Sequence, residues 1–382
     1  MRFLKRKDVY PLDTTTITYR FLTLIAISGE CSTEALPLLG ASESYGEKVI
    51  TKLKEDNLIK THYKDKLRGY RLTNVAKKLL LLENPNRFSF FLSGQTETNH
   101  PKSDYPRRLR LQQASILYVL MQNADIKIFR DEKPALFHPL LREPVALSLP
   151  VFYHSREIKE LGAEQIKINN SRTLGILLTG KTIFAVYYTG NSTMKWEYRT
   201  ELKVKAMLSY HVSQGILSTI HISPAYHPNT PFKALIIGEN MDTALKLLNS
   251  DGGYKKSYFC LDASFEYFHY APASSEGITL LKLLCSYELI QQLKQLLLSD
   301  LYAPCPDFAL EHDAVYDNRP VLLAFDFDML RISRFSTALS LHGLYGHLIC
   351  FDFQKEVLQQ YFGESVTIET IDLDKFERRF LS

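Results

Sequence analysis

Residues 53–60 read LKEDNLIK and residues 64–73 read KDKLRGYRLT, and this stretch decides the fold of the N-terminal part of the chain. The pattern predicts a helix, a strand over 58–63, a charged turn, a returning strand over 69–72 and a closing helix that begins at Thr73. This order places one helix next to one basic hairpin.

Further helices are expected before the hairpin. Apolar residues at near-helical spacing predict a first helix over 15–28 and a second that ends at Gly40. The sequence Ser44-Tyr45-Gly46-Glu47 fits a capping box, in which the serine side chain accepts a backbone hydrogen bond and the glutamate reaches back. A third helix is therefore expected from Ser44 to about Asp56. Two helices joined by a short turn that contains glycine form a helix-turn-helix.

The charge of the chain is unevenly distributed. Residues 1–82 contain 15 Lys/Arg and 9 Asp/Glu, a net charge of +6. The remaining residues contain 31 Lys/Arg and 33 Asp/Glu, a net charge of −2. A local basic surface is expected of a module that binds phosphate groups, although a solvated charged face has the same composition.

Other features of the composition exclude several classes of protein. No apolar run approaches the length of about 20 residues that a membrane span needs, and no secretory signal is recognised at the N-terminus. The five cysteines are scattered, with no Cys-x-x-Cys pair. We therefore expect reduced thiols in a cytoplasmic protein that has no membrane contact and needs no cofactor or metal.

The chain is long enough for several domains. We expect a domain over 1–82, a linker over 83–105, an α/β domain over 106–230 with a central hairpin, and a C-terminal α/β domain over 231–382. Strand and helix patterns alternate from residue 232 onward, which indicates α/β layers with some parallel strands. The expected class is therefore α/β (α+β), with a C-terminal part similar to a Rossmann fold.

The N-terminal segment resembles the winged-helix families of transcription regulators. In these families a helix leads into a hairpin and then into the pattern Y.LT..A..LL, which stands here as Tyr70, Leu72, Thr73, Ala76, Leu79 and Leu80. A winged helix followed by a large α/β region is also similar to the replication-relaxation proteins of plasmids and integrative elements.

The resemblance implies that the third helix enters the major groove of duplex DNA and that the hairpin contacts neighbouring phosphates. The residues expected to contact DNA are Ser44, Tyr45, Lys48, Thr51, Lys52, Lys64, Lys66, Arg68 and Arg71. Lys5, Arg6 and Lys7 are candidates for an N-terminal arm. A winged helix that contacts a protein through its solvated charges is the alternative.

Helix 107–122, hairpin 172–188, helix 198–214 and strand 234–237 follow the order of a restriction-nuclease-like core. Such an enzyme needs acidic residues and a lysine on its strands, to hold a metal ion and activate water. The second strand of the hairpin has neither, and Glu201 with Lys203 falls on a helix instead. We therefore expect any nuclease fold here to be degenerate.

A second enzyme hypothesis rests on carboxylates at strand ends. Glu239 and the pair Asp326 and Asp328 resemble a toprim-like Mg²⁺ site, although Gly238 precedes the glutamate where toprim domains have the reverse order. The alternative is that these carboxylates cap helices. His211, His221 and His227 lack metal-ligand spacing, and the aromatic stretch 258–270 is read as core rather than as a platform for single-stranded bases.

From these observations we expect a DNA-binding accessory or regulatory protein that is not an enzyme. It would serve replication, transfer or gene control on a mobile element, and its partner would be double-stranded DNA. The α/β region would bind a protein partner or form a homodimer. The alternatives are a divalent-metal nuclease or toprim-like phosphotransfer enzyme, and a protein-interaction scaffold.

Overall fold

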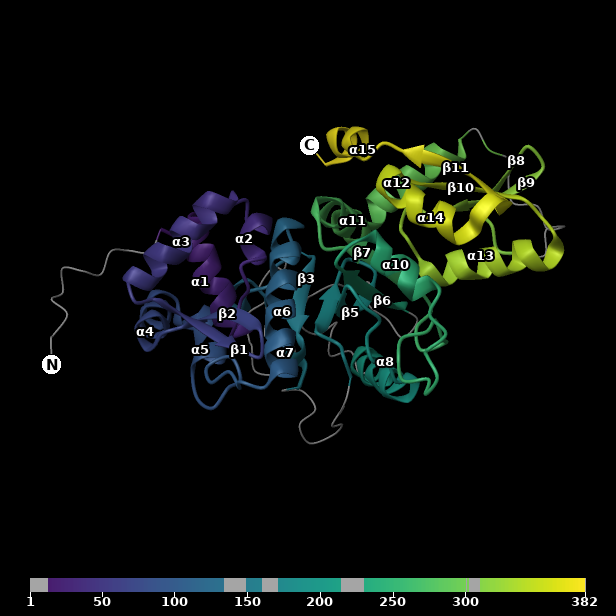
Figure 1. Ribbon diagram of the computed structural model, residues 1–382. Helices are drawn as coiled ribbons and strands as arrows, with labels where there is room; N and C mark the ends of the chain where they lie inside the picture. The colour runs from purple at the N-terminus through teal and green to yellow at the C-terminus, as the bar shows by residue number, and fades with distance from the viewer. Residues whose placement is uncertain are drawn as a thin grey trace, which may run out of the picture. The chain divides into compact units, whose positions relative to one another are not determined.

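The computed structural model describes residues 13–133, 149–159, 171–213, 230–299, 301 and 310–381. Over these residues the chain is a mixed α/β protein with a two-stranded, a five-stranded and a four-stranded sheet (Figure 1). The expected α/β class is therefore confirmed. The chain divides into two compact units, one of residues 1–119 with 129–131 and one of residues 120–128 with 132–382.

The first unit begins with three helices, α1 (Ile17–Ser28), α2 (Ala35–Leu38) and α3 (Glu43–Glu55). Gly29 ends α1 with a φ of 89°, a left-handed value that glycine adopts without strain. The expected capping box is not formed, because the N-cap residue of α3 is Ser42, two residues before Ser44, and Ser42 makes no side-chain cap hydrogen bond.

The hairpin follows, with β1 (Ile59–Lys64) antiparallel to β2 (Leu67–Leu72). Asp65 and Lys66 form the turn with φ values of 52° and 60°. Two-residue turns with positive φ at both positions are common in hairpins, because their twist matches the right-handed twist of the two strands. Helix α4 (Asn74–Glu83) begins where expected, because the Thr73 hydroxyl accepts a hydrogen bond from the Ala76 amide.

Residues 83–105 do not form the linker that we expected. They contain α5 (Pro85–Leu92), which is capped by the Asn84 side chain and packs against α1 and α4. Phe88 and Phe91 of this helix are buried. The apolar side chains that we expected to anchor a linker instead form the buried face of a helix, and the first unit continues into α6 (Tyr105–Asn123).

The second unit contains a five-stranded sheet whose strand order follows the chain, β3 (Val151–His154), β4 (Gly175–Leu178), β5 (Ile183–Gly190), β6 (Phe232–Gly238) and β7 (Phe268–Pro272). The strands β3, β4 and β5 are antiparallel, which includes the expected hairpin, and β5, β6 and β7 are parallel. Helix α8 (Tyr198–Ser213) lies between β5 and β6 along the chain. The boundary that we expected at residue 230 therefore falls between two neighbouring strands of one sheet.

The four-stranded sheet consists of β8 (Ala314–Tyr316), β9 (Arg319–Leu323), β10 (Gly346–Phe351) and β11 (Val366–Ile371) in the order β11-β10-β9-β8. Its last three strands in sequence are parallel. The helices α10 (Met241–Leu248), α13 (Met329–His342), α14 (Lys355–Phe362) and α15 (Leu373–Phe380) alternate with strands, as expected for α/β layers.

One hydrophobic cluster joins the two sheets of the second unit. It includes Ile236 and Phe268 from the first sheet and Leu322 and Leu348 from the second, all fully buried. The helix expected over 280–298 is two helices, α11 (Ser275–Cys285) and α12 (Tyr287–Leu298), because Ser286 caps the second one. Among the described residues, no helix combines the length and apolar character needed to cross a bilayer.

Candidate nucleic-acid interface

Helix α3 presents a polar face to solvent. Val49, Ile50 and Leu53 form its buried side. The five residues that we expected to contact DNA from this helix are all exposed: Ser44, Tyr45, Lys48, Thr51 and Lys52. Residues four positions apart lie on the same side of a helix, so Ser44, Lys48 and Lys52 form one continuous stripe.

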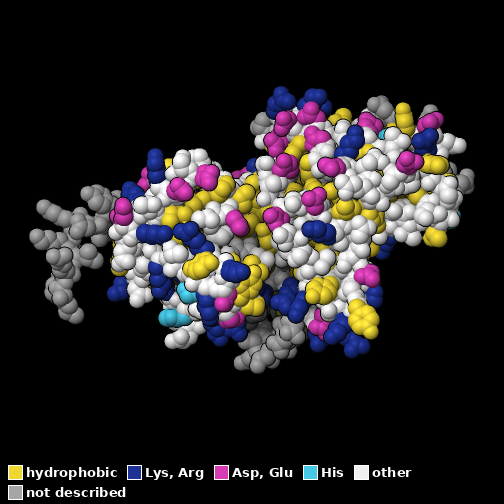
Figure 2. All heavy atoms as spheres, viewed as in Figure 1, with side chains coloured by type: hydrophobic (Ala, Val, Ile, Leu, Met, Phe, Trp, Pro, Cys, Tyr) yellow, Lys and Arg dark blue, Asp and Glu magenta, His cyan; other side chains and the backbone are white. Residues whose placement is uncertain are grey.

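The hairpin presents its charged turn to solvent as well. Lys64, Lys66 and Arg68 are exposed, as expected. The end of α3 meets β2 at the Tyr70 ring, since Lys54 Nζ lies 5.4 Å and Arg68 Cζ 5.8 Å from the ring centroid. Figure 2 shows Lys and Arg side chains spread over the visible face of the unit that carries α1 to α5, with Asp and Glu between them.

Two exposed residues of this surface were not among those predicted. Tyr63 is 68% exposed and stands opposite Arg68 in the hairpin register, and Lys54 follows Lys52 on α3. Alternation along the strand could not have identified Tyr63, because Ile59 lies on the same face of β1 and is buried.

Arg71 differs from the other eight predicted contacts, because it is buried. Its Nε atom donates to Glu30 at 2.7 Å, and its two terminal nitrogens donate to the carbonyl oxygens of Pro101 and Lys102. The side chain points into the unit because β2 passes from the exposed turn to the core along residues 67–72. Arg71 therefore holds the hairpin in place and is not available to a duplex.

Glu30 is the centre of a buried polar cluster that the sequence did not reveal. Arg108 of α6 donates to both of its carboxylate oxygens, and the Gln112 side chain donates to one of them at 2.7 Å. The glutamate and Arg108 are both completely buried. Burial alone would raise the pKa of Glu30, but the hydrogen bonds from Arg108, Arg71 and Gln112 outweigh it and hold that pKa below its ordinary value.

The same cluster also forms hydrogen bonds to the backbone of the hairpin. Arg108 donates to the carbonyl oxygens of three hairpin residues, and Gln112 donates to a fourth, which together are His62, Lys64, Leu67 and Arg68. Gly69 leaves room for this contact, since a Cβ atom there would lie 2.2 Å from a Glu30 oxygen. The orientation of the hairpin is thus determined by α6, far away in sequence.

The three carboxylates of the alternative, toprim-like Mg²⁺ hypothesis do not converge. Glu239 follows the carboxyl end of β6, whereas Asp326 lines a cavity together with Lys233 from the start of that strand. Six residues of strand separate these two ends, which corresponds to about 20 Å. Among the described residues, no group of three or more acidic, histidine or cysteine side chains is arranged to hold a metal ion.

Asp328 has a structural role. It is buried, and its Oδ1 atom accepts hydrogen bonds from the amides of Phe268 and Leu330, so that it caps α13 and ties this helix to β7. Burial raises the pKa of Asp328 above its ordinary value. This arrangement corresponds to the helix-capping alternative that we considered for the strand-end carboxylates.

Glu201 and Lys203 point in different directions from α8. Glu201 is buried and accepts hydrogen bonds from the hydroxyls of Tyr187 and Ser171, whereas Lys203 is exposed. Desolvation raises the pKa of Glu201, and it raises that of Tyr187 as well. The Glu-x-Lys sequence therefore does not form the acid and lysine pair of a nuclease.

Replacing Glu201 with glutamine is expected to raise the thermal unfolding temperature of the full chain by a few degrees at pH 7. The raised pKa means that the folded state prefers the protonated acid, so the buried charge costs stability once the pH rises above the ordinary value of 4.5 toward the folded value. Glutamine keeps an acceptor for Tyr187 without that charge. The gain should vanish below about pH 4, and Glu197→Gln, an exposed change near the start of α8, should have little effect at either pH. A lower unfolding temperature for Glu201→Gln at pH 7 would contradict this account.

Several sequence predictions concern residues whose placement or side chain is not described. The arm residues Lys5, Arg6 and Lys7 lie outside the described residues, as do His221, His227 and Cys305, and the side chain of His211 is likewise not described. The four described cysteines are free thiols. In the stretch 258–270, Phe259, Phe265 and Phe268 are buried around Trp196, as the core interpretation predicted.

No family model, curated protein or solved structure matches this chain.

Proposed function

We propose that the first unit is a winged helix that binds duplex DNA, with α3 as the recognition helix and the β1–β2 hairpin as the wing. The chain would act as an accessory or regulatory protein in the replication, transfer or gene control of a mobile element. The second unit would contact a protein partner or a second copy of the chain.

One observation carries this proposal. Of the nine polar and basic residues expected to contact DNA, the eight on α3 and around the hairpin turn are exposed. Five of these are Lys or Arg, which provide phosphate contacts, while Ser44, Tyr45 and Thr51 provide hydroxyl groups for phosphates or base edges. The buried polar cluster around Glu30 supports the same function, because it holds the hairpin turn in a defined position. The entropy cost of ordering the turn is then not part of DNA binding.

The proposal is tested by incubating the full chain with duplex DNA, once with a chelator and once with Mg²⁺. We expect binding in the chelator and intact DNA in Mg²⁺, because the described residues do not assemble a metal-binding cluster. Cleavage that depends on Mg²⁺ would instead support an enzyme. Absence of binding under both conditions would favour a protein-interaction scaffold and would contradict the proposal.

A further inference from the structure

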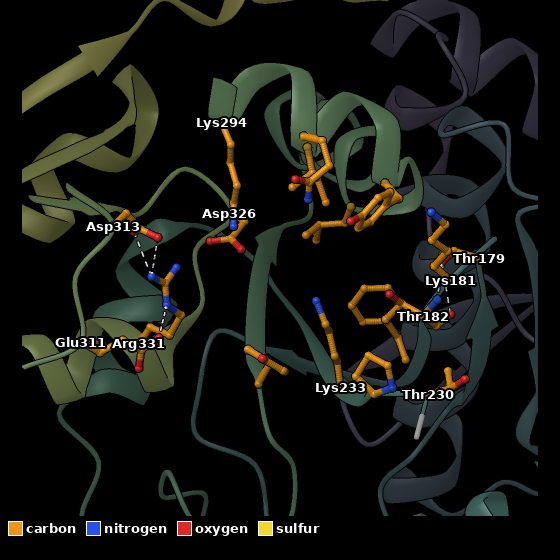
Figure 3. A pocket seen from close by; sticks show the side chains of 17 residues that line it. Thr179, Lys181, Thr182, Thr230, Lys233, Lys294, Glu311, Asp313, Asp326 and Arg331 are labelled. Atoms are coloured by element: carbon orange, nitrogen blue, oxygen red, sulfur yellow. Dashed lines mark hydrogen bonds and ion pairs between the residues drawn. The ribbon is translucent and has the colours of Figure 1, made fainter. Parts of the chain in front are cut away.

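The second unit contains a cavity of about 700 Å³. Its walls are the turn between β4 and β5, the start of β6, helix α12 and the residues that follow β9 (Figure 3). This volume is in the range of sites that take small organic ligands. Much of its lining lies at the amino ends of the parallel strands β5, β6 and β7, and Asp326 follows the carboxyl end of β9.

The cavity has an excess of positive charge. Arg331 is neutralised, since it forms ion pairs with Glu311 at 2.8 Å and Asp313 at 2.9 Å. Three lysines remain, and within the described part of the chain none of them has an acidic partner within 4.0 Å; they are Lys181, Lys233 and Lys294. With Arg331, the lining holds four cations against the three carboxylates of Glu311, Asp313 and Asp326, a formal net charge of +1.

The lysines approach this space from different elements. Figure 3 shows Lys233 pointing into the cavity from β6, with Lys181 and Lys294 on opposite sides of it. Desolvation lowers the pKa of Lys233, although Asp326 and Asp328 act in the opposite direction. A bound anion would stabilise the charged form of this lysine, because an opposite charge at short range offsets the cost of burial.

Aromatic rings form the apolar part of the wall. Lys233 Nζ lies 4.7 Å from the centre of the Tyr267 ring, and Lys181 Nζ lies 4.0 Å from that of Tyr287. Phe184 is a third lining ring. Such rings offer stacking surfaces to a planar group, whatever its identity. The cavity therefore combines rings that can stack with cations that can bind an anion.

Asp326 adds an acceptor for hydrogen bonds. Its Oδ1 atom has no hydrogen-bond partner among the described residues, and its Oδ2 atom is 3.9 Å from His269 Nδ1, too far for a hydrogen bond. That histidine nitrogen is closer to the carbonyl oxygen of Asp326, at 3.0 Å. A buried carboxylate oxygen that lacks donors is costly, so a hydroxyl or amino group on a ligand would be favourable beside this half-buried side chain.

We propose that this cavity binds a nucleotide-class ligand, a planar base joined to a phosphate. The phosphate lies among Lys181, Lys233 and Lys294, the base stacks on the tyrosine rings, and a hydroxyl or amino group of the ligand donates to Asp326. A free mononucleotide and the phosphorylated end of a DNA strand share this chemistry. The site is separate from the proposed duplex-binding surface and does not depend on it.

The test is calorimetric titration of the full chain with each of the four ribonucleoside 5′-monophosphates, adenosine, inorganic phosphate and a 5′-phosphorylated tetranucleotide. At least one monophosphate is expected to bind ten or more times as tightly as either adenosine or phosphate alone. Lys233→Met should weaken that binding at least tenfold, because it removes the central charge and keeps the length of the side chain. Lys255→Met, at an exposed lysine outside the cavity lining, is the matched control and should bind like the parent.

The two sources of the ligand give different results. Tight binding of the tetranucleotide with weak binding of every monophosphate, again lost in Lys233→Met, would assign the site to a strand end. If Lys233→Met fails to fold, Lys294→Met takes its place and is expected to weaken nucleotide binding in the same way. The proposal is overturned if no nucleotide binds more tightly than phosphate, or if the lysine variants bind like the parent.

Discussion

Replacing Lys48, Lys52 and Arg68 together with glutamate is expected to weaken the binding of random duplex DNA by the full chain about a hundredfold or more at roughly 0.1 M salt. Each of these side chains is exposed on α3 or the hairpin. A hydrogen bond to a charged group contributes about 1.5 kcal/mol or more, and three of them exceed the free energy of a hundredfold change in affinity. Glutamate adds repulsion from the phosphates.

The control for this variant has the same change in charge at a different place. Lys195, Arg199 and Lys255 of the second unit are exposed, and changing them to glutamate also takes the net charge of the chain from +4 to −2. If affinity depended only on net charge, both variants would bind equally weakly. Equal weakening by the two triple variants would therefore mean that α3 and the hairpin are not the DNA-binding surface. Equilibrium binding measured by fluorescence anisotropy with a labelled duplex distinguishes these outcomes.

The second large effect concerns stability. Glu30→Ala is expected to destabilise the first unit by about 3–5 kcal/mol, because it leaves two buried arginines without their carboxylate. Arg108 and Arg71 would keep their bonds to backbone carbonyls but lose the negative charge that compensates them. Mutation of Glu55, an exposed residue at the end of α3, to alanine is the control and should change stability by less than about 0.5 kcal/mol.

Hydrogen exchange of the hairpin amides in the full chain provides the most specific readout for Glu30→Ala. The cluster holds the hairpin by four carbonyl groups, so the amides of β1 and β2 should exchange faster in the variant. The five-stranded sheet of the second unit should exchange at the parent rate. Unchanged protection of the hairpin amides would show that the cluster is not needed to hold it.

The same cluster predicts how stability depends on pH. The folded pKa of Glu30 is lower than the ordinary value of 4.5, so its contribution is fully present above pH 4.5 and is lost as the pH falls through the folded value. In Glu30→Ala this acid-dependent loss should be smaller. Comparing the hydrogen exchange of parent and variant, each corrected for the intrinsic exchange rate, at pH 7 and in mild acid measures the difference.

The local features of the first unit could be predicted from the sequence. The glycine that ends α1, the threonine that caps α4 and the charged turn of the hairpin are all local signals, and they position these elements to within a few residues. The exposed residues of α3 follow from its helical period. The capping box at Ser44 was not formed, because a serine two residues earlier already precedes the helix.

The long-range features could not be predicted in this way. Arg71 follows Arg68 at a spacing that does not reveal which of them is buried, and its burial depends on Glu30, which is 41 residues away. Arg108 is 78 residues from the same glutamate. The cavity lysines come from three separate elements of the second unit, so linear spacing contains no signal for them. Pairing across such distances depends on the packed fold rather than on local patterns.

The central claim is that α3 and the hairpin bind duplex DNA through phosphate contacts, and a salt series with the full chain tests it most directly. The five exposed cations on α3 and the hairpin, Lys48, Lys52, Lys64, Lys66 and Arg68, predict that the logarithm of affinity falls linearly with the logarithm of salt concentration, with a slope of about −4 to −5. The Lys48, Lys52 and Arg68 variant should reduce the steepness of this slope by roughly 3. Absence of duplex binding at low salt, or binding whose affinity does not change with salt, would contradict the account.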